Sequence, residues 1–181
     1  MGRKHFDTRG TNGVLIIAGF IAVGKTTLAK KDKHVLDLTL STNGTTEVEL
    51  KKFGADYVNL ILQHVNKPEP SRPRTIVISA HPAVLDELEA RDIQYSLVYP
   101  EWKELFSYLK RIHRRDGKDS YAYSTVQLEG TDMIKDYELR KYPTHYQLSG
   151  KQTLRNVYNV IMYDYYMFDK IDDYPYHVPF A

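Results

Sequence analysis

A glycine-rich segment directly after a short apolar run carries the clearest chemical meaning in this sequence. It reads Gly19-Phe-Ile-Ala-Val-Gly24-Lys25-Thr26-Thr27 and follows Val14-Leu-Ile-Ile-Ala18. The segment fits the pattern G-x-x-x-x-G-K-[ST] without a mismatch. Where a buried strand turns into a helix in this way, backbone N–H groups converge on an anion, the lysine adds a positive charge, and the hydroxyl after it can bind Mg²⁺. The segment therefore predicts a nucleoside triphosphate site, with ATP and Mg²⁺ as the expected ligands.

We expect the residues of this loop to serve both the phosphates and the metal ion. Lys25 is a candidate catalytic residue, and Thr26 is the candidate Mg²⁺ ligand. The expected nucleotide contacts come from Gly19, Ala22, Val23, Gly24, Lys25, Thr26 and Thr27.

A single carboxylate lies in the next apolar segment, His34-Val-Leu-Asp37-Leu. A carboxylate within an apolar strand is costly unless it is paired, hydrated or bound to a metal. Beside a phosphate site, Asp37 could accept a proton from an attacking hydroxyl or hold the hydration shell of Mg²⁺. The structural alternative is a salt bridge or a cap on the following loop. We treat Asp37 as a candidate catalytic residue.

The third apolar segment, Thr75-Ile-Val-Ile-Ser-Ala80, ends without an aspartate. Motor ATPases and switch GTPases need a metal-holding carboxylate at that point, so the sequence disfavours them and favours a small-molecule kinase. Ser79 and His81 stand at this strand end instead and are candidate contacts to a phosphate or to the acceptor. His81 could equally cap the helix that begins at Pro82.

A basic helix end, Lys110-Arg111-Ile-His-Arg114-Arg115, precedes Asp116-Gly117. Arg111 and Arg115 are four residues apart and therefore share one helix face. Guanidinium groups suit the spreading negative charge of a transferring phosphoryl group, so this pair predicts an arginine lid with catalytic residues Arg111 and Arg115. Arg114 is expected to point away from this helix face and is the weaker candidate. The alternative is a solvated helix end whose cations complement the helix dipole.

Apolar periodicity predicts the elements that position these side chains. Strands are expected at residues 14–18, 34–38, 75–80, 94–99 and 145–148, and helices at residues 26–31, 47–65, 82–90, 101–115, 128–141 and 152–168. This alternation predicts an α/β protein: a three-layer P-loop kinase fold with a mostly parallel sheet of about five strands. Ligands bind at the carboxyl ends of such strands, where the candidates above lie.

The last three helices carry further expectations. The helix at 101–115 is expected to place an apolar side inward, made of Trp102, Leu105, Phe106 and Leu109. An interruption is expected near Gly130, and Tyr158, Ile161 and Tyr165 are expected to seal the last helix onto the sheet. Among the fifteen tyrosines, the candidates for stacking on a base are Tyr121, Tyr123 and Tyr146.

Composition and chain length exclude several classes of protein. The 181 residues suit one domain, expected at 14–168, with a basic arm at 1–13 and an extended tail at 169–181. With no cysteine there is no disulfide, thiolate metal site or cysteine nucleophile. The longest apolar stretch, residues 14–23, is too short to span a membrane, so we expect a cytoplasmic protein without a membrane partner. A net charge of +2 is too small to indicate a nucleic-acid partner.

Several of these motifs together resemble a group of small P-loop kinases that bacteriophages frequently encode, often labelled nucleotide or adenylate kinase-like. The resemblance covers residues 14–117, with a looser echo at 145–154. It is carried by the loop followed by Thr-Leu-Ala-Lys-Lys, by Val35-Leu-Asp-Leu with Ser41, by Val77-Ile-Ser-Ala-His81 leading to Tyr95-Ser-Leu-Val-Tyr-Pro100, and by Tyr108-Leu-Lys-Arg111-Ile-His-Arg-Arg115-Asp-Gly. It implies a nucleoside- or nucleotide-kinase-like fold, in the host cytoplasm if phage-encoded, with a site made of Lys25, Thr26, Asp37, Arg111 and Arg115.

The expected function is transfer of the γ-phosphoryl group of ATP to a nucleotide-like acceptor, either a nucleoside or a nucleoside monophosphate. The first alternative is a phage DNA kinase that acts on a polynucleotide end or on a hydroxymethylated base such as 5-hydroxymethyluracil in DNA. It is motivated by the basic arm and the aromatic tail. The second alternative is a non-catalytic ATP-binding module with a regulatory or assembly role. The acceptor, the base preference and the oligomeric state stay open.

Overall fold

A parallel β-sheet forms the centre of the protein. The computed structural model describes residues 9–42 and 44–171, and within them the sheet has five strands in the order β2-β3-β1-β4-β5, each pair parallel. The strands are β1 (Leu15–Gly19), β2 (Val35–Asp37), β3 (Thr75–Ser79), β4 (Ser96–Pro100) and β5 (Thr144–Leu148). Gly19 at the end of β1 lies opposite Ser79 in β3 and Val98 in β4. The carboxyl ends of the three central strands therefore meet at one edge.

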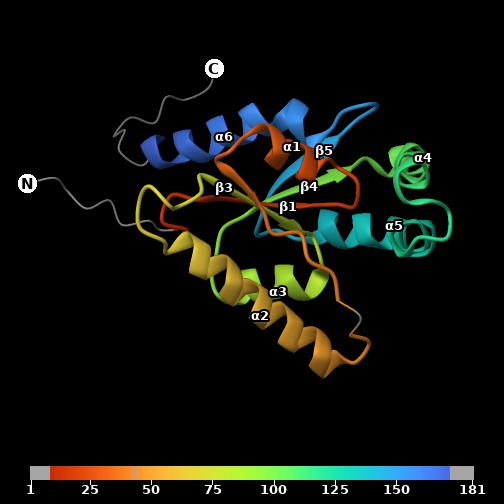
Figure 1. Cartoon of the computed structure of the whole chain (residues 1–181), viewed down its shortest axis with the longest axis horizontal. Helices are drawn as coiled ribbons and strands as arrows, with labels where there is room; N and C mark the ends of the chain where they lie inside the picture. Colours follow the sequence, from red (N-terminus) through yellow and green to blue (C-terminus); the bar gives the residue numbers. More distant parts are fainter. Residues whose placement is uncertain (1–8, 43, 172–181) are drawn as a thin grey trace, which may run out of the picture.

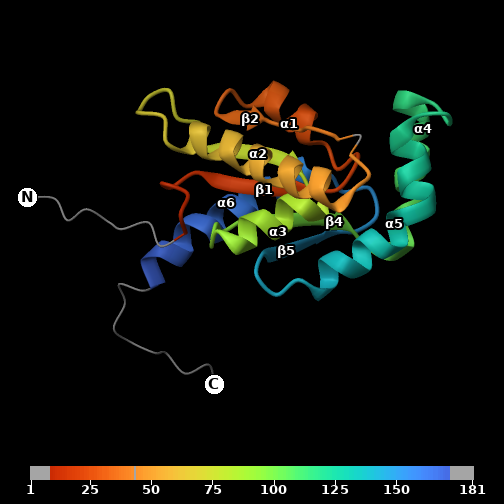
Figure 2. The same ribbon diagram turned by 90° about the horizontal axis from the view of Figure 1, so that it is seen from below.

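Helices cover both faces of this sheet (Figure 1). They are α1 (Lys25–Lys31), α2 (Glu47–Val65), α3 (Pro82–Ala90), α4 (Leu105–Asp116), α5 (Tyr121–Leu139) and α6 (Leu154–Ile171), with a short 3-10 turn, η1 (Trp102–Glu104), before α4. In Figure 1, α1 and α6 lie on one face, and α2, α3 and α5 lie on the other. Figure 2 shows α4 standing beside the end of α5, away from the sheet. The expected α/β layering and the parallel sheet are confirmed.

The apolar character of the central strands explains why they form a two-sided core. All five residues of β1 are buried, as are all five of β4 and the first four of β3. A parallel strand covered by helices on both sides must be apolar on both faces, which is the pattern that these segments show. Among the described residues, none of the helices has the length and apolar character that crossing a bilayer requires.

The prediction for the apolar side of α4 was right for Leu105 and Leu109, which pack against the core, and wrong for Trp102 and Phe106. Trp102 and Phe106 are 69% and 66% exposed, whereas Tyr108 and Ile112 are fully buried. Residues 102–104 form the 3-10 turn η1. This turn changes the angular spacing, so Trp102 does not continue the helical stripe of α4.

Other element boundaries also differ from expectation. Helix α5 begins at Tyr121 and runs without interruption through Gly130, which packs against Leu105. Strand β4 begins at Ser96 and includes Pro100. Helix α6 begins at Leu154 and continues to Ile171, so the expected tail does not begin at residue 169. The remainder of that tail, 172–181, and residues 1–8 of the arm lie outside the described residues.

The described part of the N-terminal arm is packed against α6. Thr11 is fully buried, and the Arg9 guanidinium lies 3.7 Å from the centre of the Tyr165 ring. The Tyr165 hydroxyl donates to the Val14 carbonyl at 3.0 Å. Tyr158 and Ile161 on the same helix are buried, and the Tyr158 hydroxyl is 2.8 Å from that of Thr75. The expected sealing of this helix onto the sheet is confirmed.

Candidate functional site

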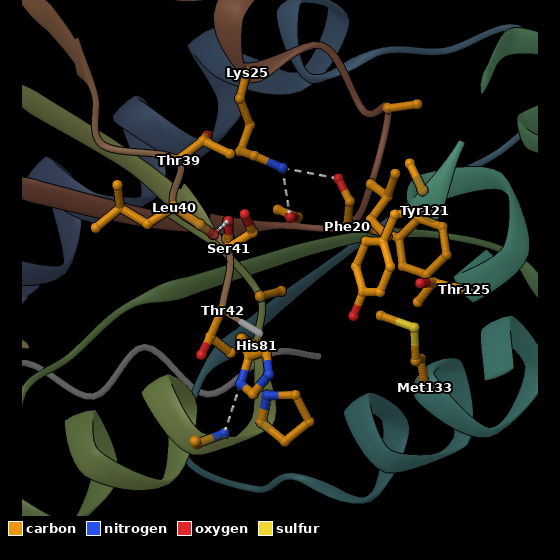
Figure 3. Close-up of a pocket in the computed structure, with 18 of the residues that line it drawn as sticks. Phe20, Lys25, Thr39, Leu40, Ser41, Thr42, His81, Tyr121, Thr125 and Met133 are labelled. Carbon is orange, nitrogen blue, oxygen red and sulfur yellow. Dashed lines mark hydrogen bonds between the residues drawn. The ribbon is translucent and has the colours of Figure 1, made fainter. Parts of the chain in front are cut away.

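A cleft of about 1850 Å³ opens at the carboxyl edge of the sheet, beside the end of β1. One end, which we call the lysine end, is formed by the β1–α1 loop with Lys25 and by the last turns of α4. The other end, the α5 lobe, is lined by His81, Tyr121, Thr125 and Met133 over a floor that includes Phe20 and Tyr137. Figure 3 shows the two ends in one view.

Lys25 lies buried at the start of α1, and the loop itself satisfies its ammonium group. Its Nζ donates to the Gly19 carbonyl at 2.7 Å and to the Phe20 carbonyl at 3.0 Å. Burial lowers the pKa of Lys25 from 10.5 to about 8; the nearby Asp37 carboxylate raises it and the Arg115 guanidinium lowers it further. Lys25 is therefore mostly charged at neutral pH and is held at the wall of the cleft.

The backbone before Lys25 turns through conformations that favour glycine. Gly24 has φ of +102° and Ala22 has φ of +63°, both in the left-handed region. Six of the seven expected contact residues line the cleft, namely Gly19, Ala22, Gly24, Lys25, Thr26 and Thr27. Val23 does not line it: its side chain is fully buried, and its carbonyl accepts a hydrogen bond from the Leu154 amide at 2.8 Å.

Thr26 and Asp37 are brought together from α1 and β2. The Thr26 hydroxyl donates to Asp37 Oδ2 at 2.6 Å, and the Thr39 amide donates to Asp37 Oδ1 at 2.9 Å. Burial alone raises the pKa of Asp37, but hydrogen bonds from Thr26 and Thr39 and the charge of Lys25 outweigh it, so the pKa lies below its usual value. An ionised carboxylate thus stands directly beside the hydroxyl expected to bind a metal.

Arg111 and Arg115 both line the lysine end of the cleft, as their spacing predicts. Arg111 Nη1 donates to the Gln152 carbonyl at 3.2 Å, and its guanidinium lies 4.5 Å from the centre of the Tyr108 ring. Arg115 Nε donates to its neighbour Asp116 at 2.7 Å. Arg114 is exposed and does not line the cleft. The site thus combines two guanidinium groups with the ammonium of Lys25.

Ser79 and His81 lie where expected, at the end of β3, and each has a structural partner. The Ser79 hydroxyl donates to the Leu40 carbonyl at 2.7 Å. His81 is the N-cap of α3, where its Nδ1 accepts a hydrogen bond from the Ala83 amide at 3.2 Å. Burial lowers the pKa of His81, so its ring is neutral at pH 7. Both residues still line the cleft.

The sequence did not single out Tyr57, whose hydroxyl fixes one wall of the cleft. This buried hydroxyl donates to the Leu38 carbonyl and accepts hydrogen bonds from the Leu40 amide at 3.0 Å and the Ser79 amide at 3.2 Å. It thereby fastens the segment after Asp37 to the end of β3. The helical spacing of Tyr57 indicated only a core position, because periodicity carries no information about a hydroxyl partner.

Of the three tyrosines that were candidates for base stacking, only Tyr121 lines the cleft. Tyr123 packs against His113, with ring centres 6.2 Å apart, and the Tyr146 hydroxyl donates to Asp164 at 2.7 Å. Thr125 and Met133 lie four and twelve residues after Tyr121 and therefore share its face of α5. Figure 3 places these three side chains across the cleft from His81.

No protein-family model matches the chain, and comparisons with curated proteins and with solved structures also give no match. Function is therefore inferred from the geometry of the cleft.

Proposed function

We propose that the protein is an ATP-dependent phosphotransferase with a P-loop kinase fold, which moves the γ-phosphoryl group to a nucleotide-like acceptor. The observation that carries this proposal is the convergence of three parts of the chain on one cleft. Lys25, Thr26 and the guanidinium groups of Arg111 and Arg115 line its lysine end. Asp37 does not line the cleft, but its carboxylate accepts a hydrogen bond from the Thr26 hydroxyl at 2.6 Å. Cations beside a metal-binding hydroxyl are what a triphosphate and its transfer require.

The donor phosphates fit the lysine end in charge and in backbone shape. The left-handed backbone at Ala22 and Gly24 bends the loop around the anion. Within the described residues, the Lys25 ammonium bonds to the loop carbonyls of Gly19 and Phe20, and it can exchange those bonds for phosphate oxygens. Oxygen ligands suit Mg²⁺, so Thr26 would hold the ion and Asp37 would accept from its hydration shell. When bound, Mg²⁺ neutralises charge that develops between the phosphates.

Charge neutralisation and positioning supply most of the acceleration in phosphoryl transfer, because the transition state is loose. Arg111 and Arg115 would close over the transferring group as an arginine lid. Arg111 is tied to Gln152, and Leu154 just beyond it bonds to the loop carbonyl of Val23. The lid helix and the β1–α1 loop are thus connected through the segment that leads into α6.

The test is transfer from γ-labelled ATP to a panel of nucleosides, nucleoside monophosphates and DNAs. Lys25→Ala should lower the transfer rate by on the order of 10³-fold and weaken ATP binding, because it removes a charge used in the transition state. Lys31→Ala, an exposed lysine of the same helix outside the cleft, is the matched control and should keep full activity. Full activity in Lys25→Ala would refute the site. ATP binding without transfer to any acceptor would favour the non-catalytic module.

A polynucleotide acceptor is the second candidate, because of the outer surface of α4 and η1. Trp102 and Phe106 are exposed there, and the Lys110 ammonium lies 4.4 Å from the centre of the Phe106 ring. Exposed aromatic rings beside cations suit single-stranded nucleic acid. Such binding should weaken steeply with salt, whereas salt-insensitive or absent DNA binding would remove this candidate.

A further inference from the structure

A second, smaller cavity of about 540 Å³ lies at the opposite edge of the sheet from the cleft, and we call it the amino-edge pocket. Its lining includes residues that precede β1, β2 and β3 and two residues of α6, in this order Val14, His34, Arg74, Met162 and Tyr166. Figures 1 and 2 show the start of β1 and the loop before β3 at the end of the sheet away from α4. The five residues of β1 separate this pocket from the cleft by about 16 Å.

The backbone fixes one guanidinium group at this pocket. Arg72 Nε donates to the Lys67 carbonyl at 2.8 Å, and Arg72 Nη1 donates to the Asn12 carbonyl at 3.2 Å. These bonds hold the partly buried side chain between the loop before β3 and the residues before β1. Because a guanidinium group has further N–H donors, Arg72 can bind a ligand without giving up either bond.

The second guanidinium group, that of Arg74, has no such partner. Within the part of the chain that the structure describes, the side chains of Arg74 and His34 make no hydrogen bond or ion pair, although both line the pocket. Glu69 is the one carboxylate among the described lining residues; it is exposed and forms no ion pair with an arginine of the pocket. Asp32 accepts the His34 amide at 2.9 Å and does not line the pocket. Two guanidinium groups therefore face one solvated carboxylate, and the lining is positive.

The rest of the lining suits the body of an organic ligand. Met162 and Tyr166 of α6 line the pocket together with two prolines, Pro70 and Pro73. The Tyr166 side chain is 38% exposed, so a flat group can reach its ring. Burial raises the pKa of Tyr166 and the charge of Arg74 opposes this change, so the guanidinium lies near that hydroxyl. The volume falls within the range of about 300–1,000 Å³ that is typical of small-molecule sites, and an inorganic ion alone would not fill it.

We propose that the amino-edge pocket binds a small phosphate monoester that carries a flat ring, of the size of a nucleoside monophosphate. Arg72 and Arg74 bind the phosphate oxygens, and the ring lies against Tyr166 and the prolines. Guanidinium groups suit phosphate geometry, and two of them match the roughly two negative charges of a phosphate monoester better than the single charge of a carboxylate. This binding is separate from the cleft and does not depend on the proposed transfer reaction.

The methionines provide a separate reporter for each site, because Met162 lines the amino-edge pocket and Met133 lines the cleft. The full chain with isotope-labelled methionine methyl groups is titrated with adenosine 5′-monophosphate, and both resonances are followed by NMR. We expect the Met162 resonance to shift until it saturates, and adenosine, which lacks the phosphate, to leave it in place. An unmoved Met162 resonance, or an equal shift with adenosine, would overturn the inference. A shift of Met133 alone would overturn it too and would leave the proposed function standing.

A pair of variants tests whether the unpaired guanidinium group binds the phosphate. Arg74→Gln should raise the Kd that Met162 reports about tenfold, because it removes a charged hydrogen-bond donor, and should leave any Kd that Met133 reports unchanged. The melting temperature checks that the fold is kept. Arg155→Gln, an exposed arginine of α6 that lines neither cavity, is the matched control and should change neither constant. An unchanged Kd in Arg74→Gln, or an equal rise in both variants, would show that the phosphate does not bind in this pocket.

Discussion

The β1–α1 loop at the lysine end and the α5 lobe differ in how far apart in the sequence their residues lie. The loop consists of nine consecutive residues, 19–27, although Arg111 and Arg115 at the same end come from α4. The α5 lobe draws on His81 before α3 and on Tyr121 to Tyr137 of α5, and the segment after Asp37 faces it. Local backbone geometry sets the loop, whereas packing between distant elements sets the lobe and brings the two arginines of α4 to the lysine end.

This difference has a consequence for mutations. Side chains of the β1–α1 loop are placed by the loop's own backbone, so replacing them should affect chemistry and leave the fold intact. Replacing groups that hold the distant walls of the cleft in place should affect stability and substrate positioning together. The predictions that follow test this separation.

The largest effect is expected at the lid arginines. Arg111→Ala and Arg115→Ala should each lower kcat by on the order of 10³-fold, because each removes a charge that would stabilise the transferring phosphoryl group. Steady-state transfer assays measure this effect. Arg114→Ala, one helix position from Arg115 but outside the cleft, should keep kcat within about twofold of wild type. Equal losses in all three variants would mean that the basic helix end acts only as a general charge.

Asp37→Asn should lower kcat by about 10²-fold and also lower the melting temperature, because both carboxylate oxygens accept hydrogen bonds, from Thr26 and Thr39, and the amide has only one oxygen. The amide keeps one oxygen for the Thr26 hydroxyl but loses the negative charge that would accept a proton or order a metal shell. Asp56→Asn, an exposed carboxylate on α2, is the control. Mg²⁺ titrations of both variants separate the two roles: a raised Mg²⁺ requirement indicates the metal shell, and an unchanged one indicates proton transfer.

Tyr57→Phe should lower the free energy of unfolding by about 1 kcal/mol, because it leaves backbone groups of Leu38, Leu40 and Ser79 without their shared partner. Chemical denaturation measures the loss. KM for the acceptor should rise as well, since the segment after Asp37 is released from β3. Tyr163→Phe removes a hydroxyl from a tyrosine that is 64% exposed and should change neither quantity. If the two variants behave alike, the hydroxyl of Tyr57 does not fix the wall.

The smallest effect concerns the pH dependence of ATP binding. With a pKa of about 8 for Lys25 in the folded protein, the Kd for ATP should rise about tenfold between pH 7 and pH 9 as the ammonium loses its proton. Calorimetric titration at the two pH values measures it.

Stability should change in the opposite direction. The folded pKa lies below the unfolded value of 10.5, so the cost of burying the charge is fully present below pH 8 and is relieved as the pH rises towards 10.5. Compared with Lys25→Met, the wild type should therefore gain stability between pH 8 and pH 10. A difference between the two proteins that stays constant with pH would contradict the lowered pKa.

Much of the fold could be predicted from periodicity. The sequence predicted residues 47–65 and 82–90 as helices, and α2 and α3 have those bounds. The strands β1, β3 and β5 also lie close to their expected positions. Periodicity works here because a buried strand or a one-sided helix must repeat its apolar residues at a fixed interval.

Two of the errors have different physical origins. Trp102 was expected on the apolar side of α4, but it lies in the 3-10 turn η1, through which a repeat of 3.6 residues does not continue. Helix α5 was expected to break near Gly130, but that glycine lies against Leu105, where a larger side chain would be crowded. Local backbone geometry decided the first outcome, and a tertiary contact, which periodicity cannot represent, decided the second.

What the sequence by itself determined is the β1–α1 loop of the lysine end. A loop of this pattern folds on itself, so Gly24, Lys25 and Thr26 take their places from neighbours within a few residues. Only the tertiary structure decided that Asp37 bonds to Thr26, that Tyr57 fastens the wall, and that His81 faces Thr125 across a lobe of mostly neutral or acidic lining. Those contacts join residues far apart in the chain, and they form only when the helices pack against the sheet.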